Sequence, residues 1–312
     1  MKIAIYGVGG VGGYLGAQLA RVGTDIALIA RGEHLRAIRD QGLCVTSPSG
    51  EILVQPSLAT DDPREVGAVD VVILAVKAAQ VAEAAEAIRP MVGSGSFVLP
   101  LQNGVEAASQ LTAVLGERHV VAGLCGMMSW KTAPGHIRTL GDVNFVRLGE
   151  LDNRPSQRTV DLCEVFDRAG VKAEVPTDIH RALWEKFLFI ASAGGVGALT
   201  GRTFGAIRDD GESMRMLEMA MREIFTLAQR RGVALETGTV ERTLDFFREL
   251  PAEGTSSMQR DLAARRPSEL EAWNGAVVRL AGERGLPVPV NRFIYETLLP
   301  RDTDARRQLS KN

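Results

Sequence analysis

The sequence has few cysteines and histidines and no excess of charge of either sign. Its three cysteines, Cys44, Cys125 and Cys163, lie far apart without a CxxC motif, and its four histidines form no pair at ligand spacing. This spacing indicates neither a disulfide framework nor a zinc site, and we expect no bound metal. The formal net charge is −2, with basic residues scattered along the chain, which argues against binding to nucleic acid or to an anionic membrane.

Long apolar segments are also missing. We find no run of about 18 or more apolar residues that would span a bilayer, and the short apolar run at the N-terminus is a strand broken by glycines rather than a secretory signal. These observations predict a cytoplasmic protein. With 312 residues and 45% hydrophobic content, the chain is long enough for two globular domains. Its polar last residues, 301–312, are expected to fray.

What the sequence does contain is a glycine-rich turn between an apolar strand and a helical pattern. The strand Ile3–Tyr6 leads into Gly7, Gly9 and Gly12 at GxGxxG spacing, and a second apolar strand, Asp25–Arg31, follows the helix. In this order, backbone N–H groups and the positive end of the helix dipole can approach a pyrophosphate. A glycine-rich turn without a ligand is the alternative. We predict a dinucleotide loop made of Gly7, Val8, Gly9, Gly10, Val11 and Gly12.

The residue at the end of the second strand selects the cofactor. An acidic residue there would accept a hydrogen bond from a ribose 2′-hydroxyl, whereas this chain has Arg31. A guanidinium can grip a phosphate through two parallel hydrogen bonds, so we predict NADPH rather than NADH. The alternative is an ordinary solvated arginine.

The two halves of the chain have different patterns. Strands alternate with helices as far as Pro176, as a parallel sheet with crossover helices requires, and nearly everything beyond Pro176 has a helical pattern. We predict an α/β protein with a Rossmann-type dinucleotide-binding domain at residues 1–176 and an all-helical substrate domain at residues 177–312. The predicted helices of the second domain are Arg181–Leu199, Glu212–Arg231, Thr239–Leu250, Ser257–Arg266 and Glu269–Arg284.

Polar side chains follow two predicted strands of the first domain. Lys77 and Gln80 come after Val69–Val76, and Asn103 is the next-to-last residue of the run Ser96–Gly104. Ligands of open α/β sheets bind beyond the carboxyl ends of the strands, so we expect these residues to contact the cofactor. For both Lys77 and Asn103 an ordinary turn residue is the alternative, and Asn-Gly is a common turn dipeptide.

In the second domain, Lys186 stands among apolar neighbours in LWEKF. Partial burial would lower the pKa of its ammonium and make it a proton donor near neutral pH. The alternative is a lysine whose stem covers apolar surface while its head stays in water. Ser257 and Glu269 are further candidates, although each also fits an ordinary helix start.

Several short motifs together resemble the ketopantoate reductase family, in order and across nearly the whole chain. They are GVGGVG, Arg31, LAVKAAQ, LQNG, LWEKF, TSSM, Ser268-Glu269 and Trp273-Asn274-Gly275. The resemblance implies a Rossmann domain joined to a helical domain similar to that of 6-phosphogluconate dehydrogenase. It also implies NADPH-dependent reduction of a 2-keto acid, most simply 2-dehydropantoate (ketopantoate) to pantoate in pantothenate biosynthesis.

The resemblance also implies roles for single residues. Lys186 corresponds to the catalytic lysine, and Glu269 to the acidic residue that positions the substrate. Asn103 corresponds to an asparagine shared by the nicotinamide ribose and the substrate, and Ser257 to a substrate-binding serine. Transfer of hydride to a carbonyl carbon builds negative charge on the oxygen, which a lysine can neutralise by giving a proton.

One departure from the family pattern concerns the substrate. Family members that reduce ketopantoate carry asparagines four and eight residues beyond the lysine, where this chain has Ile190 and Gly194. On a continuous helix both positions lie on the same face as Lys186. We therefore expect surroundings that are apolar at 190 and empty at 194, suited to a bulkier or more apolar keto acid. Alternatively, Asn274, Asn291 or another side chain supplies the missing contacts and the substrate is unchanged.

Two other functions remain open from the sequence. One is a different NADP-dependent hydroxyacid dehydrogenase, and the other is an NADP(H)-binding sensor without catalysis. Retention of Lys186, Asn103, Ser257 and Glu269 argues against a sensor, which needs only the nucleotide half. We expect a small 2-keto acid as the only partner besides the cofactor, with a homodimer left open.

Overall fold

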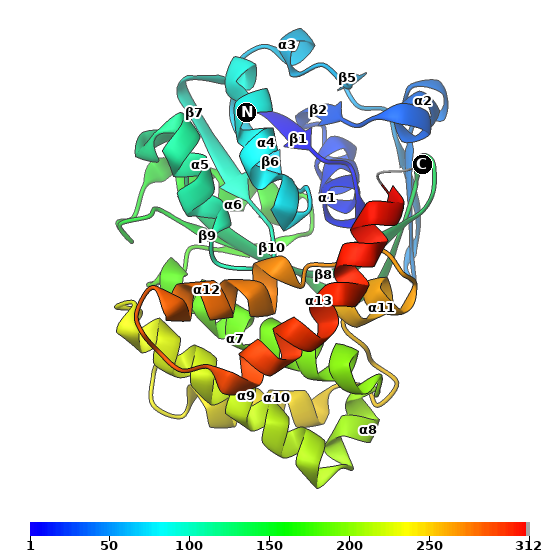
Figure 1. Cartoon of the computed structure of the whole chain (residues 1–312). Coiled ribbons are helices and arrows are strands. Elements are labelled where there is room, and N and C mark those ends of the chain that lie inside the picture. Colours follow the sequence, from blue (N-terminus) through cyan, green and yellow to red (C-terminus); the bar gives the residue numbers. More distant parts are fainter. Residues whose placement is uncertain (310–312) are drawn as a thin grey trace. The chain divides into compact units, whose positions relative to one another are not determined.

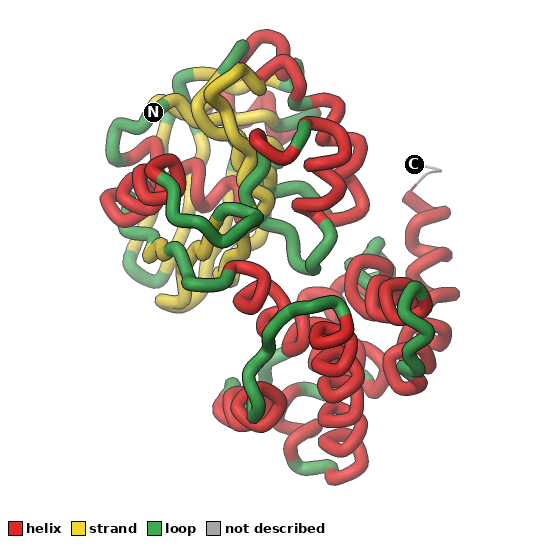
Figure 2. Tube along the Cα trace, turned by 90° about the vertical axis from the view of Figure 1, so that its left-hand side faces the viewer, coloured by secondary structure: helices red, strands yellow, loops and turns green. Residues whose placement is uncertain are grey.

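The computed structural model describes residues 1–309 and divides into two compact units. The first unit comprises Met1–Gln102 and Glu106–Ala182, and the second comprises Asn103–Val105 and Leu183–Asn312. Strands occur in the first unit, whereas the described part of the second unit contains helices and loops (Figures 1 and 2). The α/β class is confirmed. The predicted bounds of the dinucleotide-binding domain, 1–176, and of the helical substrate domain, 177–312, stay a prediction.

The first unit is built on a five-stranded parallel sheet. Its strands lie in the order β5 (Leu58–Thr60), β2 (Asp25–Ile29), β1 (Lys2–Tyr6), β6 (Val69–Leu74) and β7 (Val92–Pro100). Because all five strands point the same way, the segments that follow β1, β2, β6 and β7 come out at one edge of the sheet. The glycine loop, Arg31, Lys77 and Gln102 are in these segments.

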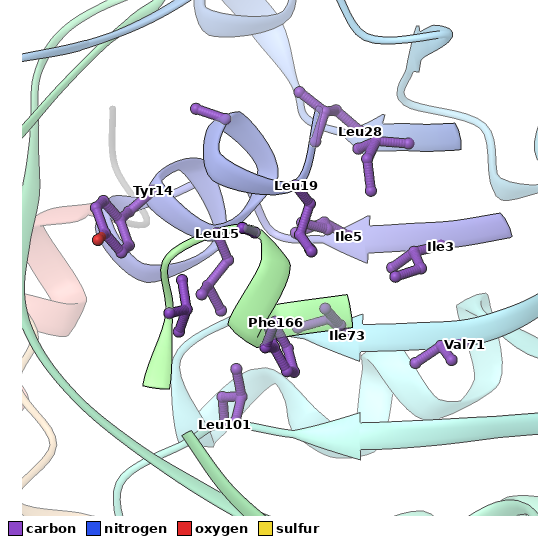
Figure 3. Close-up of a cluster of buried hydrophobic side chains, with 14 of the residues drawn as sticks. Ile3, Ile5, Tyr14, Leu15, Leu19, Leu28, Val71, Ile73, Leu101 and Phe166 are labelled. Carbon is purple, nitrogen blue, oxygen red and sulfur yellow. The ribbon is translucent and has the colours of Figure 1, made fainter. Parts of the chain in front are cut away.

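Successive side chains of β1 point to opposite faces of this sheet. Ile3 and Ile5 belong to one buried cluster together with Leu15 and Phe166, which come from α1 (Gly10–Arg21) and α6 (Gln157–Arg168), as Figure 3 shows. Ala4 and Tyr6 belong to a second cluster. That cluster includes side chains from α4 (Val81–Ala87) and α5 (Ala107–Leu115). Helices on both faces explain why these strands are continuously apolar.

A second sheet of the first unit has two long strands at its centre. Strands β8 (Ala122–Ala133) and β9 (His136–Gly149) pair antiparallel. Strands β3 (Leu43–Ser47), β4 (Gly50–Val54) and β10 (Lys172–Glu174) complete this sheet. The remaining short helices of the unit are α2 (Gly32–Gln41), α3 (Pro63–Val66), η1 (Ala78–Gln80), η2 (Arg89–Met91) and η3 (Glu117–His119).

The second unit packs helices around the buried side chains of α7 (Ile179–Thr200), whose first residues lie in the first unit. The predicted helix from Glu269 is a π-helical turn, η4 (Glu271–Gly275), followed by α12 (Ala276–Gly282). The other helices are α8 (Phe204–Arg208), α9 (Gly211–Arg230), α10 (Thr239–Glu249), α11 (Ser257–Ala263) and α13 (Pro289–Leu309).

The structure corrects two expectations. Residues 301–309 do not fray but continue α13, because Asp302 and Ala305 are buried against the unit; residues 310–312 lie outside the described part. In addition, α7 is long and apolar enough, by length and composition, to cross a membrane. Of its most apolar window, 67% is buried inside the structure, as in the core helix of a globular unit.

Candidate active site

Gly7, Gly9 and Gly12 of the predicted dinucleotide loop have different steric surroundings. Gly7 has φ +99°, which L side chains rarely adopt, and a Cβ there would lie 2.9 Å from Val76 Cγ1. A Cβ at Gly12 would lie 2.0 Å from the Gly7 carbonyl oxygen, so only glycine lets α1 begin this close to β1. A Cβ at Gly9 would meet no described atom within 4 Å. Gly9 therefore leaves open backbone at the helix start, where a pyrophosphate can approach.

Two neighbouring glycines serve packing within the first unit. A Cβ at Gly10 would lie 2.1 Å from the Ser129 carbonyl oxygen of β8, and one at Gly13 would lie 2.6 Å from Ile137 of β9. The β8–β9 hairpin thus lies directly against the start of α1. Gly10 was predicted as part of the dinucleotide loop, and this contact gives it a structural role as well.

His34 ties the glycine loop to that hairpin. Its Nε2 donates to the Val8 carbonyl oxygen at 2.7 Å, and its Nδ1 accepts from the Gly135 N–H at 2.8 Å. This pair of bonds requires the neutral ring with its proton on Nε2. Burial lowers the pKa of His34 and so favours that form, against the hydrogen bond to Val8, which raises it. This role could not be predicted from the sequence, since both partners are backbone atoms distant in the chain.

Arg31 lies at the start of α2, directly after β2. Its Nη2 is 3.3 Å from the Tyr6 hydroxyl and 4.0 Å from Glu83 Oε1. The Arg31 and Glu83 side chains are largely exposed, so this ion pair is weak and can open. Arg31 is thus a cation at the carboxyl edge of the sheet that is held by the Tyr6 hydroxyl and accessible to an anion.

The predicted residues after β6 and β7 form short, ordered connections. Lys77 and Gln80 are exposed in and beside η1, where Gln80 Oε1 accepts from the Lys77 N–H at 3.3 Å. Gln102 is buried and donates to the carbonyl oxygens of Leu74 and Val76 at 2.9 and 3.1 Å. Gln102, which was not singled out from the sequence, therefore ties the end of β7 to the end of β6.

The Asn103–Val105 segment belongs to the helical unit. Val105 packs against the core of that unit, and a Cβ at Gly104 would lie 3.3 Å from the Ala272 carbonyl oxygen. Gly104 has φ +120°, which explains why glycine follows the asparagine. Asn103 is half-buried. The structure therefore places Asn103 in the same unit as Lys186, Ser257 and Glu269.

The α7 face with Lys186 is apolar and tightly packed. Lys186 and Ile190 are half-buried. Position 194, predicted to be empty, is not: a Cβ there would lie 2.5 Å from Cζ3 of Trp273. The indole ring of Trp273, which belongs to η4, takes the space that glycine leaves. The expectation of room for substrate beside Gly194 is therefore wrong.

The other predicted residues of the helical unit differ in their surroundings. Glu269 is 8% exposed, and its carbonyl oxygen accepts from the Trp273 N–H at 3.0 Å. Ser257 is half-buried in the first turn of α11, after the N-cap residue Ser256. Asn274 has no exposed surface, and its Nδ2 donates to the Ala191 carbonyl oxygen and to Asn291 Oδ1. Asn274 therefore joins helices inside the unit.

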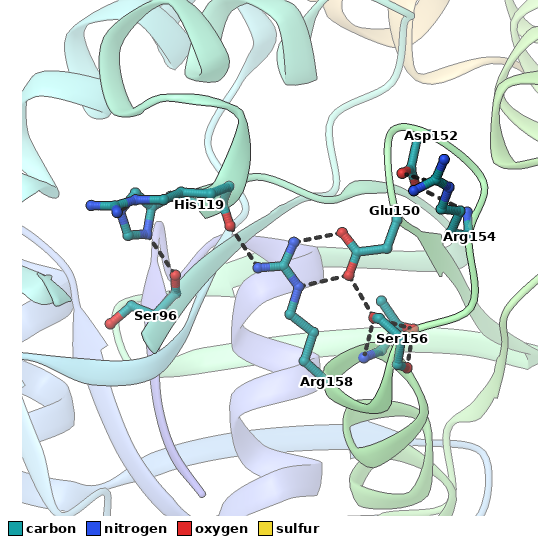
Figure 4. Close-up of polar contacts among 9 residues, drawn as sticks. Ser96, His119, Glu150, Asp152, Arg154, Ser156 and Arg158 are labelled. Atoms are coloured by element: carbon teal, nitrogen blue, oxygen red, sulfur yellow. Dashed lines mark hydrogen bonds and ion pairs between the residues drawn. The ribbon is translucent and has the colours of Figure 1, made fainter. Parts of the chain in front are cut away.

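One surface cavity of the first unit involves none of the predicted residues. It has a volume of about 520 Å³ and is lined by residues that include Arg118, Glu150, Asp152, Arg154 and Arg158. Four of its charged groups form two ion pairs, Arg154 with Asp152 and Arg158 with Glu150 (Figure 4). Burial of Glu150 disfavours the carboxylate, but hydrogen bonds from Arg158 and Ser156 outweigh burial and leave its pKa lowered.

Among the side chains that the structure describes, no group of three or more His, Cys, Asp or Glu could hold a metal ion. The buried thiols of Cys44, Cys125 and Cys163 form no disulfide in the same part of the chain.

Comparison with known proteins agrees with this geometry. Residues 3–153 match the family described as ketopantoate reductase PanE/ApbA, and residues 178–301 match the C-terminal part of the same family. The 2-dehydropantoate 2-reductase of Mesorhizobium japonicum is 33% identical and covers 93% of this chain and 94% of its own length. YkpB of Bacillus subtilis, an uncharacterized oxidoreductase, is 30% identical, with coverage of 96% and 98%.

A solved structure extends the likeness to the fold. The PanE/ApbA family ketopantoate reductase from Ralstonia eutropha matches with a TM-score of 0.90 at 31% identity, covering 98% of this chain and 100% of its own. Together, the glycine loop and these relatives define a dinucleotide-dependent oxidoreductase that acts on a CH–OH group and reduces a 2-keto acid. Within that class, the chain belongs to the ketopantoate reductase family.

Proposed function

We propose that this protein uses NADPH to reduce ketopantoate, or a closely related 2-keto acid, to the 2-hydroxy acid. The observation that carries the choice of cofactor is Arg31, which presents a guanidinium after β2 where an NADH-dependent enzyme has an acidic residue. Because Glu83 is exposed and 4.0 Å away, a 2′-phosphate can replace it as the partner of Arg31. The Tyr6 hydroxyl holds the guanidinium in place for that exchange.

Within the first unit, the loop from Gly7 to Gly12 binds the pyrophosphate through backbone N–H groups, with Gly9 as the point of closest approach. Lys77 and Gln80 contact the ribose and phosphate side of the same cofactor. When bound, NADPH supplies the hydride for the keto carbon. The remaining chemistry belongs to side chains of the helical unit.

Lys186 gives a proton to the carbonyl oxygen as negative charge develops there. Asn103 and Ser257 bind the keto acid, and Glu269 orients it. The overall reaction consumes NADPH, a proton and the keto acid, and yields NADP⁺ and the hydroxy acid.

The surroundings of the keto acid are apolar at Ile190, which favours a substrate with an apolar side chain. Trp273 closes the region beside Gly194, so the substrate is compact rather than bulky there. Asn274 acts indirectly by holding η4 to α7 through the Ala191 carbonyl oxygen. Steady-state kinetics with 2-keto acids of graded side-chain size test this account. A preference for large aromatic side chains would contradict it.

The cofactor assignment is tested by Arg31→Asp, with kcat/KM measured for NADPH and for NADH. We expect loss of the NADPH preference, since the new carboxylate repels the 2′-phosphate and can accept from a 2′-hydroxyl. Arg215→Asp, at an exposed residue of α9, is the matched charge-reversal control. An NADPH preference that survives Arg31→Asp unchanged would reject the assignment.

A further inference from the structure

Ser268, the residue before Glu269, is held at three of its polar atoms by the C-terminal helix. Asp302 Oδ1 accepts from the Ser268 N–H and from the Ser268 hydroxyl, both at 2.7 Å. Arg306 Nη2 donates to the Ser268 carbonyl oxygen at 2.8 Å. The Ser268 hydroxyl also accepts from the Leu270 N–H at 3.2 Å. The backbone is therefore fixed on both sides of Glu269.

This arrangement is buried and charged. Asp302 is 2% exposed and Ser268 5% exposed. The second oxygen of Asp302 accepts from Arg306 Nε at 2.6 Å. A buried carboxylate is unfavourable unless its oxygens are hydrogen-bonded, and Asp302 Oδ1 meets this condition through Ser268. Any displacement of Ser268 would leave a buried charge short of partners, so the contact permits one position of this segment.

We propose that Asp302 is a positioning residue for Glu269, which rests on the role given to Glu269 under the proposed function. Asp302 fixes Ser268, and Ser268 fixes the start of the segment that continues into η4. The Glu269 carbonyl oxygen receives the Trp273 N–H at 3.0 Å, so the backbone of Glu269 is also held from the helix side. Displacement of an orienting carboxylate by about 1 Å is enough to slow turnover substantially.

The test compares Asp302→Asn with Ser268→Ala and with a control on the same helix. Asp304→Asn is the matched control, because Asp304 is exposed and its ion pair with the exposed Arg307 is long, at 4.0 Å. For each variant, NADPH-binding sites are counted by fluorescence titration, and kcat and KM for ketopantoate are given per site. We expect kcat/KM for the keto acid to fall at least tenfold in Asp302→Asn and severalfold in Ser268→Ala. The NADPH dissociation constant should stay within twofold, and Asp304→Asn should behave as wild type.

A purely structural role of Asp302 predicts fewer folded molecules rather than slower turnover in each. It would reduce the number of NADPH-binding sites while leaving kcat and KM per site within twofold of wild type in both variants, and that result would overturn the proposal. If Asp302→Asn does not fold, Ser268→Ala decides, because it leaves Asp302 bonded to the Ser268 N–H and to Arg306.

Glu269→Gln separates failure of this inference from failure of the proposed function. Wild-type kcat and KM in Glu269→Gln would refute the role of Glu269, and the positioning role of Asp302 with it. An impaired Glu269→Gln beside unaffected Asp302→Asn and Ser268→Ala would refute the positioning role alone.

Discussion

Trp273 packs edge-on against Gly194, so closely that a Cβ at residue 194 would stand 2.5 Å from Cζ3 of the indole. The residue that looked like an empty position on the Lys186 face of α7 is thus one half of a helix-to-helix contact. Trp273 is 2% exposed, so a larger residue at 194 would have to displace a buried ring.

Gly194→Ala should therefore destabilise the helical unit by about 1–3 kcal/mol, the usual range for overpacking a core. Thermal unfolding followed by circular dichroism measures this effect. Gly282→Ala is the matched control, because a Cβ at that helical position meets no described atom within 4 Å. The control should be neutral or slightly stabilising. Equal melting temperatures for both variants would show that α7 can move away from Trp273.

Gly9→Ala should separate folding from cofactor binding. A Cβ at Gly9 has open space, so the variant should fold and melt as wild type does. The added methyl group would stand where the pyrophosphate approaches, so NADPH affinity should fall at least tenfold in an equilibrium titration. Gly12→Ala is the contrasting variant, since its Cβ would lie 2.0 Å from the Gly7 carbonyl oxygen and should lower stability itself. Unchanged NADPH affinity in Gly9→Ala would place the pyrophosphate elsewhere.

The stability of the first unit should depend on pH through His34. Because burial lowers the pKa of His34 from 6.5, the unfolded chain takes up a proton at a higher pH than the folded chain does. The stabilisation is therefore fully present above about pH 6.5 and is lost as the pH falls below that value.

His34→Gln tests this dependence. Above pH 6.5 the variant should lose about 1–3 kcal/mol, because the buried Gly135 N–H loses its acceptor. The difference in melting temperature from wild type should shrink as the pH is lowered. His136→Gln, at an exposed histidine, is the control. A difference that stays constant with pH would mean that His34 does not titrate in this way.

Local features of the sequence predicted the nucleotide half well. The strands and the helix of β1, α1 and β2 follow from apolar periodicity, and the glycines lie in the turn between β1 and α1. Contacts between residues distant in sequence could not be foreseen. The packing of Trp273 on Gly194 and the burial of Asp302 in a polar tail depend on how helices pack, and residue spacing carries no information on that.

We propose above all that Lys186 donates the proton during reduction of the keto acid. The direct test is Lys186→Ala, with kcat for ketopantoate and the NADPH dissociation constant measured on the same preparation. The claim predicts a fall in kcat of about 10²–10⁴-fold with NADPH affinity unchanged within twofold. A kcat close to wild type, or losses of similar size in kcat and NADPH affinity, would contradict it.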